Sequence, residues 1–364
     1  MILAIETSCD DSAVALLNQS GEILFNEISS QIKFHEKYGG VVPEIASRQH
    51  LTTLPLMVKE LFKSTGINNN DLSAIAVTNR PGLIGSLLVG ASYAKSLAWL
   101  LGIDLIGIDH LEGHLLAPFL DHADLTFPYL ALIASGGHTH LFIAKAFGDY
   151  ELIGRTMDDA AGEAYDKIAK MLGFKYPGGP VIDKIALDYK NPDIEFPIPL
   201  RGKKTLDFSF SGLKTAVLKE ATKRNCYFKN QILIDYQDFL KSPQSNKKED
   251  IKNIAASFQK CMEEIISQKI QTALKLTDLK KIVITGGVAS NVGIRKKLEK
   301  TAFKFKAKLY YPDKKHCTDN AAMIGYTAYC HLKNNHDKAS FKKNLMVESK
   351  SSLAQMDIKN LFNN

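Results

Sequence analysis

The same strand–loop–strand–turn–strand pattern occurs twice in this sequence, in its first 30 residues and again after residue 128. Strands are predicted over 1–6, 12–17 and 22–28, and again over 129–134, 138–146 and 150–156. The two copies align without gaps at a constant offset of 127, which places Ser8 on Ser135 and Gly21 on Gly148. A duplication of this kind predicts an α/β protein with two similar lobes, related by a pseudo-twofold axis.

Each copy continues into a strand, a helix and a further strand. The expected elements are 74–78, 85–100 and 105–108 in the first half, and 282–285, 291–300 and 308–311 in the second. A length of 364 residues agrees with two lobes, because a single core rarely grows that large. We expect one lobe from 1–115 and 320–337, a second lobe from 116–319 with a surface insertion over about 219–253, and a polar, poorly ordered tail over 338–364.

The composition indicates the cellular compartment of the protein more clearly than its function. A net charge of +7 is compatible with a polyanionic partner such as a nucleic acid, although surface lysines alone would also produce it. The five cysteines form no CxxC pair, which favours free thiols in a reducing compartment. The N-terminal segment is acidic by Glu6, unlike a signal or transit peptide, and no run of about 18 apolar residues is present. We therefore expect a cytoplasmic protein without membrane association.

Two histidines four residues apart, His110 and His114, could bind one divalent ion from a single helix face. A metalloprotease motif would place its glutamate directly after the first histidine, whereas Glu112 lies about 200° around the helix from His110 and cannot serve as that base. The pseudo-twofold axis brings the segment around Cys317 opposite His110, and this segment contains Asp319 as a third candidate ligand. Asp319 could instead be a simple helix N-cap. Two histidines and one carboxylate suit Fe(II) or Zn(II).

Several glycine-rich turns could hold a phosphate or a nucleoside. They lie at 135–139, at 177–180 and at 285–291, and the polar loop 7–11 is the counterpart of the first of these in the other copy. Glycine lets backbone amides approach a phosphate closely, and a helix N-terminus attracts an anion. Asp166 could accept hydrogen bonds from ribose hydroxyls. Each turn on its own could also be a plain connection, and Asp166 a paired helix carboxylate.

Ten segments taken together resemble the TsaD family of tRNA adenosine threonylcarbamoyltransferases. In the family's order they are IETSCDDS, YGGVVPEIASR, PGLIGSLLVG, HLEGHLLAP, SGGHT, DDAAGEAYDK, YPGGP, DFSFSGLKTA, GGVASN and CTDNAAMI, and they span roughly residues 1–335. The resemblance implies the actin/hexokinase-like (ASKHA) ATPase fold, in agreement with the duplication. The chain departs from the family pattern at Arg80, where glycine is usual, and in its tail, which lacks a basic, Trp-containing motif.

The resemblance also implies an activity. An acyltransferase of this family moves the threonylcarbamoyl group from threonylcarbamoyl-adenylate to the exocyclic amine of adenosine 37, in tRNAs that read codons beginning with A, and releases AMP. Partners would be tRNA and TsaB-like and TsaE-like proteins, with an exposed apolar helix surface within 43–102 as the TsaB docking site. The family's site residues, carried to the matching positions of this sequence, give metal ligands His110, His114 and Asp319 for Fe(II), or Zn(II), and adenylate contacts at Ile133, Ala134, Ser135, Gly136, Gly137, Asp166, Gly179, Asp183 and Asn291.

Acyl transfer to an amine also requires a group that removes a proton. Asp10 or Asp11 is our hypothesis for that base, because the loop that carries them belongs to the lobe opposite the adenylate loops. The alternatives are a metal-dependent ATPase-fold carbamoyltransferase or kinase acting on a small molecule, and a non-catalytic scaffold with a structural metal. A metallopeptidase ranks third, because of the position of Glu112.

Overall fold

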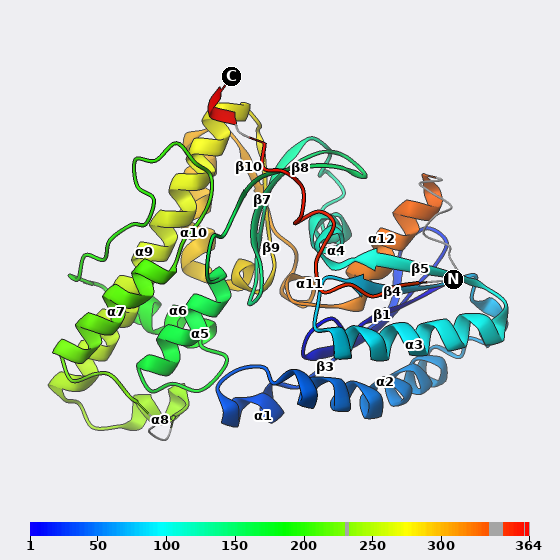
Figure 1. Ribbon diagram of the computed structural model, residues 1–364, viewed down its shortest axis with the longest axis horizontal. Coiled ribbons are helices and arrows are strands. Elements are labelled where there is room, and N and C mark those ends of the chain that lie inside the picture. Colours follow the sequence, from blue (N-terminus) through cyan, green and yellow to red (C-terminus); the bar gives the residue numbers. More distant parts are fainter. Residues whose placement is uncertain (230–232, 335–344, 360, 364) are drawn as a thin grey trace. The chain divides into compact units, whose positions relative to one another are not determined.

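The computed structural model describes residues 1–229, 233–334, 345–359 and 361–363. The chain divides into two compact units (Figure 1). Unit 1 comprises Met1–Leu125, Ala146–Tyr150 and Pro312–Met356, and unit 2 comprises Thr126–Lys145, Glu151–Tyr311 and Asp357–Asn364. These ranges differ from the expected lobes at 116–125, 146–150 and 312–319, which all lie in unit 1. Ala117 and Leu120 pack against the core under the last long helix, and the Asp313 amide donates to Asp121 (2.9 Å).

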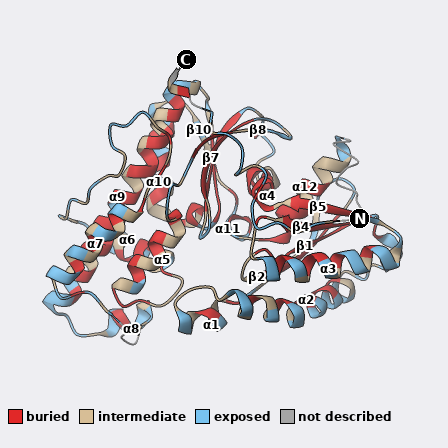
Figure 2. Ribbon diagram, viewed as in Figure 1, coloured by how far each residue is buried: buried red, intermediate tan, exposed pale blue. Residues whose placement is uncertain are grey.

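Unit 1 is built on a five-stranded mixed sheet in the order β3-β2-β1-β4-β5. The bounds are β1 Ile2–Glu6, β2 Asp11–Leu17, β3 Ile23–Ser30, β4 Ala74–Arg80 and β5 Asp104–Asp109. The first three strands form an antiparallel meander, and β4 and β5 continue the sheet in parallel with β1. Every residue of β1 is buried, because helices cover both faces of the sheet (Figure 2).

The helices of unit 1 assign each strand residue to one of two cores. Alternate residues such as Leu3 and Ile5 pack with the inner sides of α2 (Pro43–Thr65) and α3 (Ile84–Leu101), while Ala4 and Ala15 face α12 (Ala321–Lys333). Alanines suit that second face because α12 comes close to the strands: a Cβ added at Gly325 would lie 2.2 Å from Leu17. The other helices are α1 Ile32–His35, α4 His110–Leu116 and α11 Lys314–Cys317.

Helix α3 is the one described helix whose length and apolar composition would allow it to cross a membrane. A third of the residues of this helix are buried, and core helices of soluble proteins can have the same length and composition. Its inner side is buried, and Ala94 and Ala98 on that side belong to the sheet core.

Unit 2 repeats the sheet order of unit 1, as β10-β9-β6-β7-β8. The strands are β6 Tyr129–Ala134, β7 Thr139–Ala146, β8 Asp149–Arg155, β9 Lys281–Thr285 and β10 Lys308–Tyr310. An antiparallel meander is again extended by two parallel strands. The predicted strands and the predicted duplication are therefore confirmed, and the helices expected at 85–100 and 291–300 correspond to α3 and α10.

Helices α6, α7 and α10 of unit 2 pack against its long helix α9 (Figure 1). The helix bounds in this unit are α5 Ala161–Met171, α6 Gly179–Asp188, α7 Ser211–Lys223, α8 Tyr236–Lys241, α9 Asn246–Thr277 and α10 Val292–Lys304. The expected surface insertion at 219–253 is only partly a surface feature, since Phe239 of α8 is buried against Phe174 with ring centroids 5.0 Å apart. Residues 230–232 of that segment lie outside the described residues.

The tail segment 345–356 is held against unit 1 rather than being poorly ordered, and the described residues that follow it belong to unit 2. The Asn79 side chain donates to the Met346 carbonyl (3.0 Å), and the Glu348 amide donates to the Asn79 carbonyl (3.0 Å). Arg80 forms an ion pair with Glu348 at 3.3 Å. The two departures from the family pattern therefore contact each other, which gives Arg80 a partner in the unusual tail. Residues 338–344 lie outside the described range.

Candidate functional site

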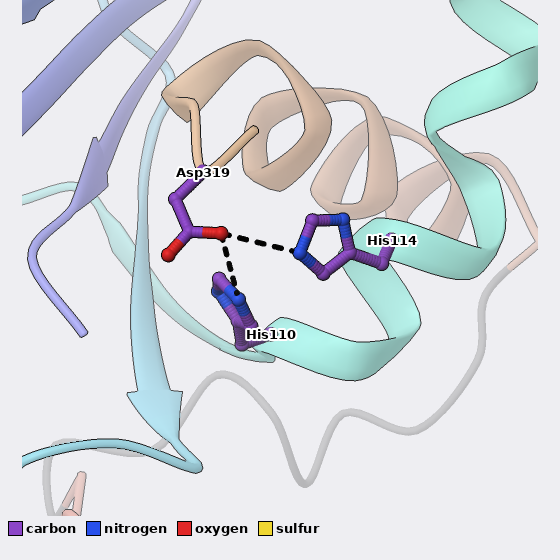
Figure 3. A group of neighbouring side chains, drawn as sticks. All are labelled: His110, His114 and Asp319. Carbon is purple, nitrogen blue, oxygen red and sulfur yellow. Dashed lines mark hydrogen bonds and ion pairs between the residues drawn. The ribbon is translucent and has the colours of Figure 1, made fainter. Parts of the chain in front are cut away.

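Two histidines and one carboxylate of unit 1 converge on one point (Figure 3). The Nε2 atoms of His110 and His114 each lie 3.3 Å from Asp319 Oδ1, and the candidate ligand atoms all lie within 4.8 Å of one another. The side chains of His110 and His114 are buried, and that of Asp319 is a quarter exposed. The structure thus brings together the three predicted metal ligands, and this donor set fits a divalent ion with open coordination positions.

Local sequence explains how α4 presents both imidazoles. The helix begins at His110, directly after β5, and Asp109 caps it by accepting the Leu111 amide at 2.9 Å. Histidines four residues apart then lie on the same face of the helix. Ser351 of the tail donates to the other oxygen of Asp109 at 2.6 Å, which fixes the cap in turn.

The Asp319 carboxylate is available to the two histidines because another residue, Asn320, caps α12. The Asn320 side chain accepts the Met323 amide at 3.0 Å and donates to the Thr318 carbonyl at 2.8 Å. The simple N-cap role considered for Asp319 is therefore wrong, because Asn320 fills that position. Cys317, which the offset between the halves had placed opposite His110, is buried and bonded to the Pro312 carbonyl at 3.1 Å.

The three ligands strongly influence one another's ionisation. Burial alone would lower the pKa of His110, but Asp319 and Glu6 together raise it well above its ordinary value. Burial lowers the pKa of His114, with only partial compensation from Asp319. Burial would raise the pKa of Asp319, and the two histidines instead hold it well below its usual range. Asp319 is thus an anion paired with a protonated His110, a charge arrangement that a divalent cation can replace.

Glu112 takes no part in this cluster. Its carboxylate accepts a hydrogen bond from the Tyr150 hydroxyl at 3.1 Å and lies 2.9 Å from His331 Nε2. The sequence-based exclusion of Glu112 as a base on metal-bound water is consistent with these contacts.

The loop predicted at 7–11 connects β1 to β2, with Asp11 as the first residue of β2, and helix α3 holds its first part. The Thr7 hydroxyl donates to the Ser86 carbonyl (3.0 Å), and the Leu83 amide donates to the Ser8 carbonyl (2.8 Å). A Cβ at Gly82 would lie 2.4 Å from that same carbonyl, so only glycine permits the approach. Thr7 and Ser8, which precede Asp10 and Asp11, are therefore held in place by the start of α3.

Asp10 and Asp11 are both partly shielded from water. Burial raises the pKa of Asp10. Burial, followed by the charges of Asp10 and Asp319, raises the pKa of Asp11 to about 7. The Oδ1 atom of Asp11 is buried and has no hydrogen-bond partner among the residues the structure describes. The charge of Asp319 acts on both aspartates, which links this loop electrostatically to the histidine–aspartate cluster.

In unit 2, the predicted adenylate contacts of the 133–137 segment lie at the end of β6 and in the turn that follows. The Ser135 amide donates to the His138 carbonyl (2.8 Å), and the Gly162 amide at the start of α5 donates to the Ser135 carbonyl (3.0 Å). A Cβ at Gly136 or Gly137 would meet no atom within 4 Å, so their backbone is open to a ligand. Ile133 and Ala134 are buried strand residues and support the turn.

The remaining predicted contacts are tied to neighbouring backbone. Asp166 accepts the Gly178 amide (2.7 Å), next to Gly179 at the start of α6. Asp183 accepts the amides of Val292 (2.8 Å) and Gly293 (3.2 Å) at the start of α10. Asn291 caps the same helix through the Ile294 amide (2.9 Å). Asp183 and Asn291 therefore lie at the start of α10, which follows β9 in the chain, and Asp166 fixes the turn before α6.

Sequence reasoning assigned no role to Glu6 or Asp109. Glu6 is fully buried and its carboxylate lies 2.9 Å from His110 Nδ1. The available signal was a charged residue at the end of an otherwise apolar strand, since such a residue is rarely buried without a partner. Its two side-chain partners Thr78 and His110 are 72 and 104 residues away in the sequence, which no local pattern reveals.

Comparison with known proteins gives consistent sequence matches. A family model described as TsaD, tRNA N6-adenosine threonylcarbamoyltransferase, matches residues 22–326. The chain is 45% identical over 327 residues to the tRNA N6-adenosine threonylcarbamoyltransferase of Clostridioides difficile (strain 630), covering 90% of this chain and 91% of that protein. It is 46% identical over 332 residues to the protein of that name from Clostridium kluyveri (strain NBRC 12016), with coverages of 90% and 91%.

Solved structures with low sequence identity share the fold. T. kodakarensis HypF matches with a TM-score of 0.59 and 14% identity, over 93% of this chain and 48% of that one. Component A of the Acidaminococcus fermentans (R)-2-hydroxyglutaryl-CoA dehydratase matches with a TM-score of 0.53 and 14% identity, over 91% and 98%. These likenesses confirm the predicted actin/hexokinase-like α/β fold and carry no conclusion about chemistry.

Proposed function

Because this chain belongs to the TsaD family of tRNA N6-adenosine threonylcarbamoyltransferases, we propose that it modifies adenosine 37 of tRNAs that read codons beginning with A. The threonylcarbamoyl donor is threonylcarbamoyl-adenylate, and the second product is AMP. The observation that carries the proposal is the convergence of His110, His114 and Asp319 in a chain of this family.

The reaction breaks one bond and forms another at the same carbonyl carbon. The lone pair of the adenosine N6 amine attacks that carbon, and the carbon–oxygen bond to the phosphate breaks. The electron pair of that bond leaves on the phosphate oxygen of AMP. The attacking nitrogen must lose one proton, so the enzyme needs a carbonyl activator, a phosphate site and a proton acceptor.

His110, His114 and Asp319 are the residues that would hold the metal, with Fe(II) as the proposed ion and Zn(II) as the second candidate. A bound divalent ion supplies Lewis acidity, which polarises a carbonyl and offsets negative charge on a leaving phosphate. Three protein donors leave coordination positions open for substrate oxygens.

Asp11 is the proposed proton acceptor, and Asp10 is its neighbour in the same loop. A base works best when its pKa lies near the working pH, and burial raises the pKa of Asp11 to about 7. Its Oδ1 atom accepts no hydrogen bond from the described residues, so no other donor competes for that oxygen.

The adenylate is proposed to lie on the open turn Ser135–Gly137, with Ile133 and Ala134 beneath it. The other proposed contacts are Asp166, Gly179, Asp183 and Asn291. The side chains of the two aspartates and the asparagine fix the loops around them. In this proposal Asp183 and Asn291 fix the N-terminus of α10, because their side chains accept its first three backbone amides.

A TsaB-like protein is the proposed partner of the outer side of α2 and α3, and a TsaE-like protein would complete the system. Large apolar side chains are exposed there, among them Leu51 (61%), Leu56 (67%) and Leu88 (49%). A groove of about 440 Å³ between the two helices is lined by Leu51, Pro55 and Leu88, among others. Contiguous exposed apolar surface of this kind marks a protein interface.

The proposed function is tested by nucleoside mass spectrometry of tRNA from cells depleted of this protein. We expect threonylcarbamoyladenosine to fall, and only wild-type protein, not the His110→Ala/His114→Ala variant, to restore it. His122→Ala is the matched control, because His122 is a histidine of unit 1 outside the cluster and should restore the modification. Normal levels of the nucleoside in depleted cells would contradict the tRNA assignment.

A further inference from the structure

We propose that Glu6 is a positioning residue that fixes the imidazole tautomer of His110, so that Nε2 is the atom free to bind the metal. The inference rests on the metal site assigned under the proposed function. Glu6 is the last residue of β1 and its side chain is completely buried. Its Oε2 atom lies 2.9 Å from His110 Nδ1, on the side of the ring away from the cluster formed by Nε2 and Asp319.

The other partners of Glu6 hold its carboxylate in one orientation. The Ser8 amide donates to Oε1 (2.5 Å), and the Thr78 hydroxyl donates to Oε2 (2.5 Å). These donors come from the loop 7–11 and from β4, so the carboxylate is fixed by two separate segments of unit 1. The Ser8 hydroxyl lies farther from His110 Nδ1, at 3.3 Å, and is a neutral group.

Hydrogen-bond chemistry then determines the tautomer. A carboxylate can only accept, so the 2.9 Å contact requires a proton on His110 Nδ1. With Nδ1 protonated, the Nε2 lone pair is the one available to a cation beside Asp319. A carboxylate behind a metal-bound histidine also makes the ring a stronger ligand, and loss of such a partner typically lowers metal affinity about 10- to 100-fold.

Replacement of Glu6 by glutamine should reverse the tautomer with almost no change in shape. The Ser8 amide needs an acceptor, so the glutamine carbonyl must take the Oε1 position. Its NH₂ group then faces His110 Nδ1 and can only donate to it. Nδ1 becomes the acceptor, the ring proton moves to Nε2, and that proton points at Asp319 in place of a metal.

The matched control is Thr78→Val, which removes the other hydrogen bond to the same Oε2 atom but leaves the carboxylate in place. A merely structural role of this buried cluster would make both variants equally harmful. A positioning role makes Glu6→Gln harmful to metal binding and Thr78→Val nearly neutral, because the Ser8 amide and the His110 ring still hold the carboxylate in that variant.

The experiment measures Zn²⁺ and Co²⁺ affinity of the full chain by competition with a chelator, without tRNA or adenylate. We expect Glu6→Gln to lose about 10- to 100-fold in affinity and Thr78→Val less than about 3-fold. NMR of ¹⁵N-histidine-labelled protein should show a proton on His110 Nδ1 in the metal-loaded wild type and on Nε2 in Glu6→Gln. Thermal unfolding of the metal-free proteins verifies that both variants fold.

Equal losses in the two variants, or wild-type affinity in Glu6→Gln, would overturn the inference. A wild-type His110 without a proton on Nδ1 would also overturn it, even if Glu6→Gln did not fold. Failure of the proposed function is a separate outcome: unchanged affinity in His110→Ala/His114→Ala would remove the metal site itself. Absence of tRNA modification with intact metal binding would leave the role of Glu6 standing.

Discussion

Asp11 has a buried oxygen without a hydrogen-bond partner in the part of the chain that the structure describes. A carboxyl group in that setting is costly to ionise, which is why burial and the nearby anions raise its pKa to about 7. Such a raised pKa has opposite consequences for folding and for proton transfer. The group therefore offers a test in which stability and activity move in different directions.

Replacement of Asp11 by asparagine should stabilise the protein at high pH and impair transfer. The folded-state pKa lies above the ordinary value of 3.8, so the stabilising effect of the protonated carboxyl is complete below about pH 4 and is lost as pH rises towards 7. Above pH 7 the variant should gain up to about 4 kcal/mol in free energy of unfolding, measured by denaturant titration.

The same variant should lose about 10²- to 10⁴-fold in the transfer rate, and with it the rise in rate as pH increases through 7. Single-turnover kinetics between pH 5.5 and 8.5 measure this. Asp10→Asn is the matched control, since its carboxyl stands next in the chain. Near-normal turnover in both variants would remove this loop from proton transfer.

Single residues also show where sequence reasoning was sufficient and where it failed. The spacing of His110 and His114 was enough to predict two ligands on one face, because helix geometry is local. Asp319 and Asn320 are both good N-cap residues, and only the bond from Met323 to Asn320 distinguishes them. Glu6 was missed because its side-chain partners Thr78 and His110 come from β4 and α4, which are brought to β1 only by the tertiary fold.

At the scale of elements, α2 and α3 have one side in the sheet core and the other exposed. Leu54 and Leu87 are buried on the inner side, whereas Leu51, Leu88 and Trp99 are exposed on the outer side. The resemblance to the TsaD family predicted an exposed apolar helix surface within 43–102, and these exposed side chains lie in that range. Composition did not predict the order of the segment 345–356. A polar tail was expected to be poorly ordered, but its Ser351 hydroxyl donates a hydrogen bond to Asp109, the cap of α4.

The outer side of α2 and α3 should lose its partner when its groove becomes charged. The double variant Leu51→Asp/Leu88→Asp should abolish co-elution with a TsaB-like protein in size-exclusion chromatography, because two buried charges cost far more than the interface gains. Phe303→Asp is the matched control, since Phe303 is 88% exposed on α10 of unit 2 and should leave co-elution intact. Co-elution of the double variant, or none with wild type, would contradict the docking surface.

At the scale of the whole molecule, one sheet topology occurs twice and supports different groups of residues. The constant offset of 127 predicted this, because a strand and its turn are encoded by local alternation and glycine positions. The histidine–aspartate cluster occurs in unit 1, and the open turn Ser135–Gly137 occurs in unit 2. The sequence predicted the extent of each unit less accurately than the sheet topology. Residues 312–319 belong to unit 1 because they contact Asp121 and nearby helices, and these contacts arise only in the tertiary fold.

The most direct test of the account is transfer by the purified protein itself. Full-length chain and a TsaB-like partner are mixed with threonylcarbamoyl-adenylate and unmodified tRNA, and threonylcarbamoyladenosine is measured by mass spectrometry after nuclease digestion. We expect modified adenosine and AMP in equal amounts with wild type, and at least a 10²-fold slower reaction with the His110→Ala/His114→Ala variant. Unmodified tRNA with wild type, or equal rates in the two proteins, would contradict the assignment of this chain as a metal-dependent transferase acting on tRNA.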